Sequence, residues 1–244
     1  MSDKLPRINK YIADLGICSR REAEELINKG WVSVNGEVLK DLSYRVSPKD
    51  NIDFSERVQT HLNKKLTIVI NKPLGYVSAQ AEDDYEPAIR LVNSENYFGK
   101  APAPKVKYKG FAPAGRLDID STGLLILTQE GKVAQKIIGP TSKIEKEYVV
   151  LVDGEITPAK IKKLCFGLKL DGQNLKRAKV TQEDQQKIRM VLTEGKKRQI
   201  RRMCELVDLK VTSLRRVRIG ALKLGSLPIG KWRLLNSKEI KNSF

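Results

Sequence analysis

The sequence predicts an α+β protein built from two modules, residues 1–60 and residues 61–244. The chain of 244 residues is long enough for a small domain followed by a medium one. Helical patterns and a short alternating stretch fill the first module, whereas the second mixes strands and helices without regular alternation. This mixture favours a mainly antiparallel sheet over a doubly wound one. Charge is divided too: the formal net charge is +17, yet residues 1–60 hold ten Lys or Arg against ten Asp or Glu.

The first module is predicted to begin with two short helices. The apolar residues of "RINKYIADLG" recur at helical spacing, and Gly16 ends the helix. In "SRREAEELINKG", Ser19 followed by Glu22 is the pattern of a capping box. Gly30 ends this second helix.

A small sheet is predicted to follow the two helices. The stretch "WVSVNGEVL" predicts a hairpin with a two-residue turn at Asn35 and Gly36. A further strand pair is predicted at 43–46 and 51–54, joined by the turn "SPKD". Residues 56–65, "ERVQTHLNKK", are polar and lack Pro and Gly, so they are predicted to be a short linker.

The second module has four clear strand patterns, "LTIVI", "GLLILT", "EYVVLV" and "KIRMVL". Helices are predicted at about 130–138, 158–166 and 198–207, the second of them starting with Thr157 and Pro158. Residues 93–110 are polar and contain Pro, which predicts an exposed loop. Its lysines could contact phosphate or could simply keep the loop soluble, and both alternatives are open. They are Lys100, Lys105, Lys107 and Lys109.

The charge of the chain predicts a polyanionic partner. A net charge of +17 exceeds the magnitude of about 2–8 that solubility requires of a small domain. Nucleic acid is the first expectation and an acidic membrane surface the second. The surplus is densest in 176–233, with 17 basic against 5 acidic side chains. No apolar run approaches the ~18 residues of a membrane helix, and the N-terminus lacks the apolar core of a signal peptide, so we expect a cytoplasmic location.

Few residue types are available for chemistry. Cys18, Cys165 and Cys204 show neither metal-ligand nor disulfide spacing, and His61 is the one histidine of the chain. Ser-His-Asp chemistry, Cys-His nucleophiles and most zinc sites are therefore excluded. We expect no metal site, and an enzyme with this composition would depend on Asp, Glu, Lys, Arg or Tyr.

The stretch "RINKYIADLGICSRREAEELINKGWVSVNGEV" resembles the ribosomal-protein-S-four-type RNA-binding domain, also called the αL fold. The combination of "SRREAEELI" with "GWVSVNG" is specific. In that family the first two helices carry the RNA-facing basic residues. The matching residues here are Arg7, Lys10, Arg20 and Arg21. The alternative for Arg20 and Arg21 is pairing with Glu24 and Glu25 on their own helix.

Four stretches of the second module resemble the rRNA pseudouridine synthases that carry this N-terminal module. They are "NKPLG" at 71–75, "GRLDIDSTGLLILTQEG" at 115–131, "KEYVVLV" at 146–152 and "EGKKRQIRRMCELVDLKVTSLRRVRIG" at 194–220. The resemblance covers nearly the whole chain, in the right order. It implies a small αL-type RNA-binding domain followed by a mixed, mainly antiparallel catalytic domain.

The implied reaction suits this composition. Conversion of uridine to pseudouridine breaks a carbon–nitrogen glycosidic bond, turns the uracil and reattaches it through carbon 5. It involves no redox change, hydrolysis or group donor, so no cofactor is expected. It does need a carboxylate that forms a covalent bond to the sugar or to the base.

The resemblance implies that Asp118, the aspartate of "GRLD", is the nucleophile, and that Asp120 is an ordinary turn residue. Burial raises the pKa of a carboxylate, so a neighbouring cation is needed to keep the nucleophile ionised. The resemblance assigns this part to Arg201, across the site from Asp118. The alternative is an i, i+4 pair between Arg201 and Glu205. We expect Arg201 to point inward because it borders the buried stripe of its helix.

Arg116 and Tyr148 are the other implied site residues. A uridine in folded RNA must be flipped out before it can react, and the resemblance implies that Arg116 fills the vacated stack; a phosphate contact is the alternative. The ring of Tyr148 is implied to lie against the uracil, where its hydroxyl would help move a proton; the alternative is plain core. Lys72, Pro73 and Gly75 are expected to shape a turn beneath the pocket, with Lys72 in a nearby ion pair.

A basic cluster is expected to bind RNA phosphates, which supplies affinity without sequence information. Its members are Lys196, Lys197, Arg198, Arg202, Arg215, Arg216 and Arg218.

The sequence as a whole predicts a cofactor-free, monomeric RNA pseudouridine synthase. The expected partner is structured RNA, either rRNA or a pre-ribosomal particle, with 23S rRNA favoured. The alternatives are the same reaction on 16S rRNA or tRNA, and a non-catalytic RNA-binding ribosome-assembly factor. A metal-dependent nuclease is disfavoured because the sequence offers no convincing cluster of acidic ligands.

Overall fold

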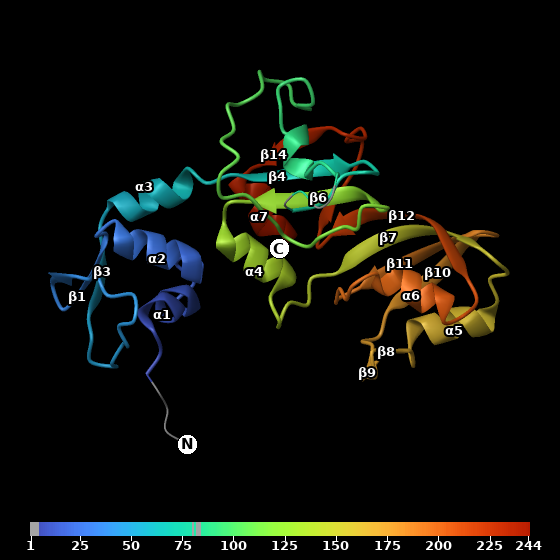
Figure 1. Ribbon diagram of the computed structural model, residues 1–244, viewed down its shortest axis with the longest axis horizontal. Helices are drawn as coiled ribbons and strands as arrows, with labels where there is room; N and C mark the ends of the chain where they lie inside the picture. Colours follow the sequence, from blue (N-terminus) through green and yellow to red (C-terminus); the bar gives the residue numbers. More distant parts are fainter. Residues whose placement is uncertain (1–4, 80, 82–83) are drawn as a thin grey trace.

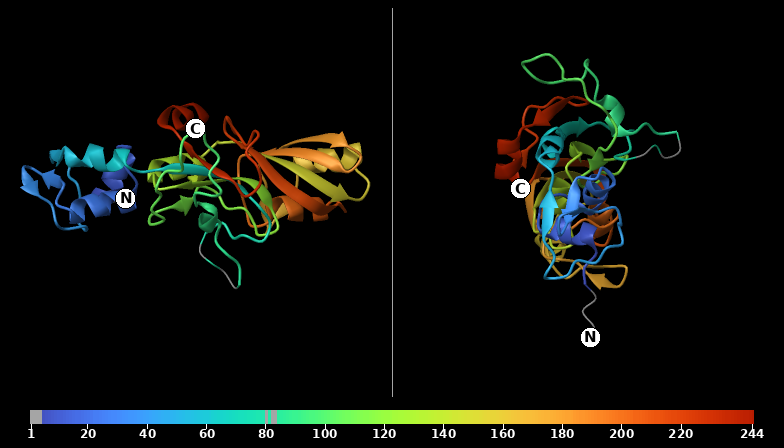
Figure 2. Two further views of the ribbon diagram at one scale, coloured as in Figure 1. Left: turned by 90° about the horizontal axis from the view of Figure 1, so that it is seen from above. Right: turned by 90° about the vertical axis from the view of Figure 1, so that its left-hand side faces the viewer.

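The computed structural model describes residues 5–79, 81 and 84–244. The molecule is elongated, with the first module at one end and a large sheet in the remainder (Figures 1 and 2). Helices and strands are both present, so the predicted α+β class is confirmed. The elements of the first module are α1 (Ile8–Asp14), α2 (Arg20–Asn28), β1 (Val32–Val34), β2 (Glu37–Val38), β3 (Ile52–Phe54) and α3 (Arg57–Asn63).

The predicted capping box and hairpin turn of the first module are confirmed. The Glu22 amide donates to Oγ of Ser19, and the Ser19 amide donates to the Glu22 carboxylate at 2.7 Å. Asn35 and Gly36 have φ values of 53° and 84°. Positive φ at both central residues is what a two-residue turn of this type requires.

The predicted pairing of 43–46 with 51–54 is wrong. β3 pairs with β1 instead, and residues 43–46 form only a single bridge, at Arg45. The carboxylate of Asp41 accepts hydrogen bonds from the amide and the hydroxyl of Ser43. Local side-chain bonds of this kind compete with strand pairing, because they offer the backbone a turn instead.

The predicted linker, residues 56–65, is also corrected. Most of it forms α3, in which Val58 and Leu62 lie one helical turn apart and pack on the core of the first module. This i, i+4 pair is the apolar side of a helix that is otherwise polar.

Nine strands form the main sheet of the second module, in the order β10-β11-β7-β12-β6-β4-β14, with β13 on β12 and β5 on β6. Its main-path strands are β4 (Thr67–Lys72), β6 (Thr122–Thr128), β7 (Lys146–Asp153), β10 (Lys179–Asp184), β11 (Lys187–Leu192), β12 (Lys210–Ile219) and β14 (Trp232–Leu235). The short strands β5 (Ala112–Pro113) and β13 (Leu222–Lys223) complete this sheet, and β8 (Lys169–Leu170) and β9 (Gln173–Asn174) form a separate two-stranded sheet. Within the described residues β12 runs parallel to β6 and the other named strand pairs are antiparallel, which confirms the predicted mixed, mainly antiparallel sheet.

The helices of the second module cover this sheet. They are η1 (Ala88–Leu91, a 3-10 helix), α4 (Gly131–Ile138), α5 (Pro158–Cys165), α6 (Gln199–Glu205) and α7 (Ser237–Ser243). The predicted helices are confirmed, including the Thr157 cap, whose side chain accepts from the Lys160 amide. Successive residues of β6 pack alternately on two hydrophobic clusters, Leu124 and Ile126 on one and Leu125 and Leu127 on the other. Burial on both faces explains the continuous apolar run "GLLIL".

The lysine-rich segment 93–110 is an exposed loop, as predicted, and it extends from the sheet in Figure 2. Its four lysine side chains are exposed. The loop returns to the sheet where Nε2 of Gln129 donates to the main-chain carbonyls of Lys107 and Lys109.

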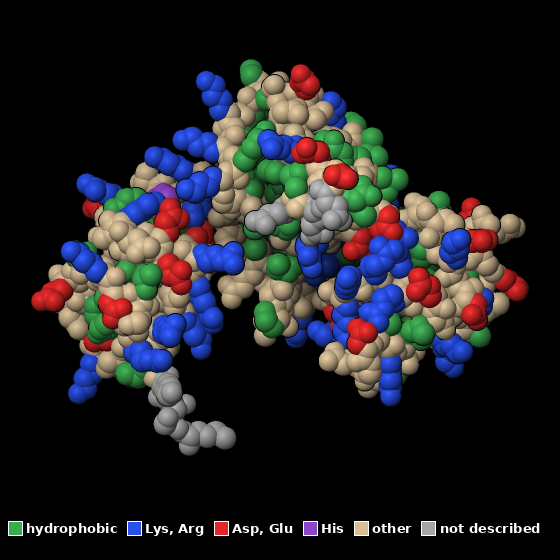
Figure 3. Space-filling view, viewed as in Figure 1, with side chains coloured by type: hydrophobic (Ala, Val, Ile, Leu, Met, Phe, Trp, Pro, Cys, Tyr) green, Lys and Arg blue, Asp and Glu red, His purple; other side chains and the backbone are tan. Residues whose placement is uncertain are grey.

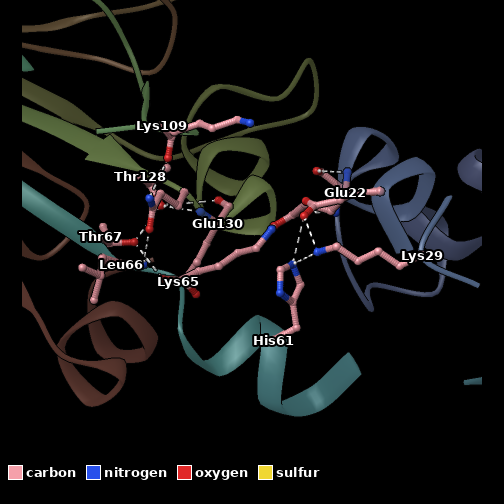
Figure 4. Close-up of polar contacts among 12 residues, drawn as sticks. Glu22, Lys29, His61, Lys65, Leu66, Thr67, Lys109, Thr128 and Glu130 are labelled. Atoms are coloured by element: carbon pink, nitrogen blue, oxygen red, sulfur yellow. Dashed lines mark hydrogen bonds and ion pairs between the residues drawn. The ribbon is translucent and has the colours of Figure 1, made fainter. Parts of the chain in front are cut away.

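The two modules are in direct contact, through an ion pair and a close approach of two helices (Figure 4). Nζ of Lys65 lies 2.7 Å from Oε1 of Glu22 in α2, whose other oxygen is held by the Ser19 amide. Burial raises the pKa of Glu22, but the hydrogen bonds from Lys65 and Ser19 outweigh it and bring the pKa below its ordinary value. A Cβ on Gly131 of α4 would lie 2.1 Å from Cβ of Ser19, so α4 can approach α2 this closely only because residue 131 is glycine.

Gly123 is a second position where two backbones meet. It has a φ of +101°, and a Cβ there would lie 2.2 Å from the carbonyl oxygen of Arg216, its register partner on β12. Glycine is thus required for the parallel pairing of β6 with β12.

We expect Gly123→Ala to lower the free energy of unfolding by about 1–3 kcal/mol more than Gly172→Ala. Gly172 also has positive φ, but a Cβ there meets nothing within 4 Å, so this control carries only the strain of about 1–2 kcal/mol. Gly123→Ala adds overpacking, which costs about 1–3 kcal/mol. Urea unfolding of both variants measures the difference, and equal losses would contradict the steric role of Gly123.

Candidate functional site

A cavity of about 790 Å³ lies beside the loop 115–121 and the N-terminus of α6. Its volume is that of a typical small-ligand pocket, about 300–1,000 Å³. Seven residues predicted for catalysis or RNA binding line it: Arg116, Asp118, Tyr148, Lys196, Lys197, Arg198 and Arg216. The predicted residues Arg201 and Arg202 lie outside this lining, as do the basic residues of the first module.

The backbone of the 115–121 loop is held from several other segments. The hydroxyl of Ser78 donates to the carbonyl of Leu117 at 2.6 Å and accepts from its amide at 2.8 Å. The amide of Gly75 donates to the carbonyl of Ile119 at 3.1 Å. The stretch "NKPLG" therefore lies against the loop that contains "GRLD" and supports its backbone, as predicted for a turn beneath the pocket.

The prediction that Arg216 binds phosphate is wrong, because this side chain is only 1% exposed. Its Nε donates to the carbonyl of Leu124 at 2.7 Å, and its two other nitrogens donate to the carbonyls of Gly115 at 3.0 Å and Arg116 at 3.4 Å. The alternation of side chains along β12 is the pattern that indicates burial of Arg216, because Leu214 and Arg216 both face inward.

Arg201 points inward, as predicted, with 8% of the residue exposed. Its Nη2 donates to the carbonyl of Asp120 at 2.7 Å, and its Nη1 to that of Val211 at 3.3 Å. Its carboxylate contact is with Asp120, whose Oδ2 lies 3.3 Å from Nε. Over the described part of the chain, Arg201 forms no ion pair with Glu205 or with Asp118.

Asp120 is therefore not the ordinary turn residue that was predicted. Oδ2 of Asp120 also accepts from Nη2 of Arg198 at 2.9 Å. Arg198 has a φ of 50°, an unusual left-handed conformation for a residue other than glycine, and its guanidinium pKa is raised by the hydrogen bond to Asp120. Two arginines thus engage Asp120, while within the described residues no hydrogen bond or ion pair engages the carboxylate of Asp118.

Tyr148 lies in a row of register partners that crosses four strands. Lys72 on β4 is opposite Gly123 on β6, Gly123 is opposite Arg216 on β12, and Arg216 is opposite Tyr148 on β7. Register partners present their side chains on the same face of a sheet. The ring of Tyr148 packs against two hydrophobic clusters and lines the cavity, so it is more than plain core.

Lys72 is fully buried, and its predicted ion pair is wrong. Nζ donates instead to the carbonyls of Pro73 at 2.8 Å and Tyr76 at 2.9 Å. Burial lowers the pKa of Lys72 to about 8, although the nearby carboxylates of Asp120 and Asp118 act to raise it.

Lys146 is a cavity residue that the sequence interpretation missed. It is 7% exposed, and its Nζ donates to the carbonyl of Ile144 at 3.1 Å. Burial, together with repulsion from Arg216 and Lys176, lowers the pKa of Lys146 to about 8. Its position two residues before Tyr148 on β7, hence on the same face of the strand, is the pattern that could have indicated it.

The predicted RNA-facing residues of the first module, Arg7, Lys10, Arg20 and Arg21, are exposed. Glu24 accepts a hydrogen bond from Asn9 and Glu25 from Lys29, each at 2.6 Å. These glutamates therefore bind other residues, and the alternative in which Arg20 and Arg21 pair with them is wrong. Figure 3 shows Lys and Arg side chains on the side of the first module that faces the second, across a hollow.

Two other members of the predicted basic cluster are engaged in ion pairs. Arg202 binds the carboxylate of Asp171 through both terminal nitrogens, at 2.6 and 3.0 Å. Arg218 binds Glu147 and Glu145. Arg215 is exposed.

Two further observations bear on the class of site. In the described ranges no group of three His, Cys, Asp or Glu side chains could hold a metal ion. No helix of those ranges combines the length and apolar character needed to cross a membrane.

We expect the stability of Lys72→Met to differ from that of the wild type in a pH-dependent way. The pKa of Lys72 is about 8 in the folded protein against 10.5 ordinarily, so between these values the unfolded chain binds more protons. Wild-type stability therefore rises with pH in this window, by about 2–3 kcal/mol up to pH 10. Methionine does not titrate. Urea unfolding at intervals from pH 7 to 10 measures the gain of wild type relative to Lys72→Met, and two parallel curves would contradict it.

Comparison with known proteins agrees with this geometry. Residues 66–206 match the family model described as RNA pseudouridylate synthase, and residues 6–52 match the S4 domain. The chain is 35% identical over 246 residues to the dual-specificity RNA pseudouridine synthase RluF of Escherichia coli (strain K12), covering 100% of this chain and 80% of the relative. It is 33% identical to an uncharacterized RNA pseudouridine synthase of Aquifex aeolicus, with 96% and 94% covered.

A solved structure gives the same result. The crystal structure of a pseudouridylate synthase matches with a TM-score of 0.67 at 27% sequence identity, over 98% of this chain and 99% of that one. The chain therefore belongs to the RNA pseudouridylate synthase family and carries an S4 domain near its N-terminus.

Proposed function

We propose that this protein converts a specific uridine of ribosomal RNA to pseudouridine, with large-subunit rRNA as the favoured substrate and Asp118 as the nucleophile. One observation carries the assignment. The carboxylate of Asp118 lines the cavity and has no partner among the described residues, whereas the carboxylate of its neighbour Asp120 binds Arg198 and Arg201. A nucleophile needs free oxygens, and the arginine contacts that would occupy them are taken by Asp120.

The reaction is an isomerisation in which atoms balance without a co-reactant. The glycosidic bond to nitrogen 1 of uracil breaks, and the carboxylate of Asp118 forms a covalent bond to the sugar or to the base. The uracil turns, its carbon 5 bonds to the sugar, and the bond to Asp118 breaks, which frees the carboxylate for the next turnover. Carbon 5 loses a proton and nitrogen 1 gains one. The hydroxyl of Tyr148, on the cavity wall, is the group we assign to this proton movement.

Arg116 suits the entry of a flipped nucleotide. Its side chain is exposed at the cavity, while its carbonyl is held by Arg216. A stacked base cannot enter a recessed pocket, so the nucleotide must leave the helix first. We assign to the Arg116 guanidinium the vacated position in the stack.

The substrate assignment uses the first module and the relatives. We propose that the first module, with α3 included, binds structured RNA through exposed basic residues, and that the second module forms the catalytic unit. An Arabidopsis thaliana relative, 32% identical over 96% of this chain and 60% of its own length, is named as a putative ribosomal large subunit pseudouridine synthase. That name supports large-subunit rRNA. The dual specificity in the name of RluF is a reason to test more than one kind of RNA.

We expect Asp118→Ala and Asp118→Asn to abolish pseudouridine formation and to leave RNA affinity within a few-fold, because neither change removes a basic group. Asp153→Asn, an exposed aspartate at the end of β7, is the matched control and should keep full activity. The assay uses rRNA and tRNA from cells lacking the gene, with pseudouridine mapped before and after addition of enzyme. Product formation by Asp118→Ala would refute the nucleophile. Wild-type product in tRNA or 16S rRNA would change the substrate, and the absence of product in all RNAs and in isolated ribosomal particles would favour an assembly factor.

We expect Arg20→Ala/Arg21→Ala to weaken rRNA binding and to reduce the magnitude of the slope of log K against log salt by about 1–2, because each phosphate contact contributes ~0.7–0.9. The rate at saturating RNA should not change. Lys40→Ala/Lys49→Ala removes the same charge from exposed positions of the same module outside the two helices and serves as the control. If both double variants weaken binding equally, the two helices have no special part in RNA recognition.

A further inference from the structure

Arg216 is a buried cation whose partners are main-chain carbonyls. Its guanidinium donates to Leu124 on β6 and to Gly115 and Arg116 in the 115–121 loop. No carboxylate of the described residues forms an ion pair with it. A buried charge is costly unless its surroundings compensate for it, and here the dipoles of three carbonyls provide the compensation.

Core packing alone does not explain an arginine at this position. Replacing buried charged groups by apolar side chains of similar volume is often neutral or stabilising. An apolar side chain at position 216 would fill the space on β12, but it could not hold the carbonyls of Gly115 and Arg116. Holding the 115–121 loop is therefore what the guanidinium adds.

Arg216 also lies between the two groups assigned to the reaction. Through the carbonyl of Arg116 it holds the backbone two residues before Asp118. Tyr148 is its register partner on β7. The hydrogen bonds of Arg216 thus set the position of the loop with respect to the strand that carries Tyr148.

We propose that Arg216 is a positioning residue, which fixes the carboxylate of Asp118 relative to Tyr148 by holding the start of the 115–121 loop against the sheet. The inference rests on the proposed function in one respect, the part of Asp118 as nucleophile. A displacement of about 1 Å can cost about 100-fold in rate, so the expected effect is on the rate of the bound complex and not on RNA affinity.

The test compares Arg216→Met, Arg216→Lys and the control Arg233→Met in the full-length protein. Arg233 lies on β14 and pairs with Glu239, away from the cavity lining. Single-turnover pseudouridine formation at saturating enzyme gives the rate, and RNA titration gives Kd. We expect Arg216→Met to lower the rate about 100-fold with Kd within threefold, and Arg233→Met to keep both.

Arg216→Lys separates positioning from charge. Lysine keeps the positive charge but has one nitrogen atom in place of the three that reach separate carbonyls in Arg216. It cannot hold these carbonyls in the same geometry, so we expect a rate at least tenfold below the wild type. A wild-type rate for Arg216→Lys would overturn the proposal, as would a loss confined to Kd. If Arg216→Met does not fold, Arg216→Lys decides the question by the same criteria.

Hydrogen exchange of the loop separates this inference from the proposed function. Faster exchange of the Leu117 and Ser121 amides in folded Arg216→Lys, with the amides of β4 and β14 unchanged, supports loop positioning whether or not Asp118 is the nucleophile. Unchanged exchange of these two amides would overturn it. An active Asp118→Ala variant would refute the nucleophile alone.

Discussion

The main-chain carbonyls of the 115–121 loop need hydrogen-bond donors, and this requirement organises the catalytic module. Buried backbone groups must be paired, and this loop forms few bonds to itself. Its donors come from β12, from α6 and from the segment after β4, namely Arg216, Arg201, Gly75 and Ser78. Stretches far apart in the sequence meet here because each supplies hydrogen-bond donors to the same short loop.

The lysines and arginines of this protein fall into two groups, those bound by the protein's own oxygen atoms and those exposed to solvent. Lys72, Arg201 and Arg216 are buried and donate mainly to main-chain carbonyls, and Arg202 and Arg218 are bound by carboxylates. Not all of the 46 Lys and Arg side chains can therefore face RNA. The exposed residues at the cavity and on the first module are the ones that can release counterions from a phosphate backbone.

Helix α4 connects the RNA-binding module with the cavity. Its first residue, Gly131, lies against Ser19 of the first module, and Ile137 and Ile138 at its other end line the cavity. An eight-residue helix is about 12 Å long. The short helix and the Glu22–Lys65 ion pair thus fix the distance between the first module and the cavity.

The sequence by itself determined the local structure and the class of site. The capping box at Ser19 and the turn at Asn35 and Gly36 follow from interactions between residues close in sequence. The apolar run of β6 predicted a buried strand, and the resemblance of "GRLD" to a known motif pointed to Asp118. It failed at residues 43–46, where the side chain of Asp41 favours a turn. Only the tertiary structure decided which charged groups meet. Arg201 reaches the carbonyl of Asp120 across 81 residues, and Arg216 reaches Gly115 across 101. Such partners are chosen by strand register and burial, because a desolvated cation must bind whichever oxygen atoms the sheet brings within reach.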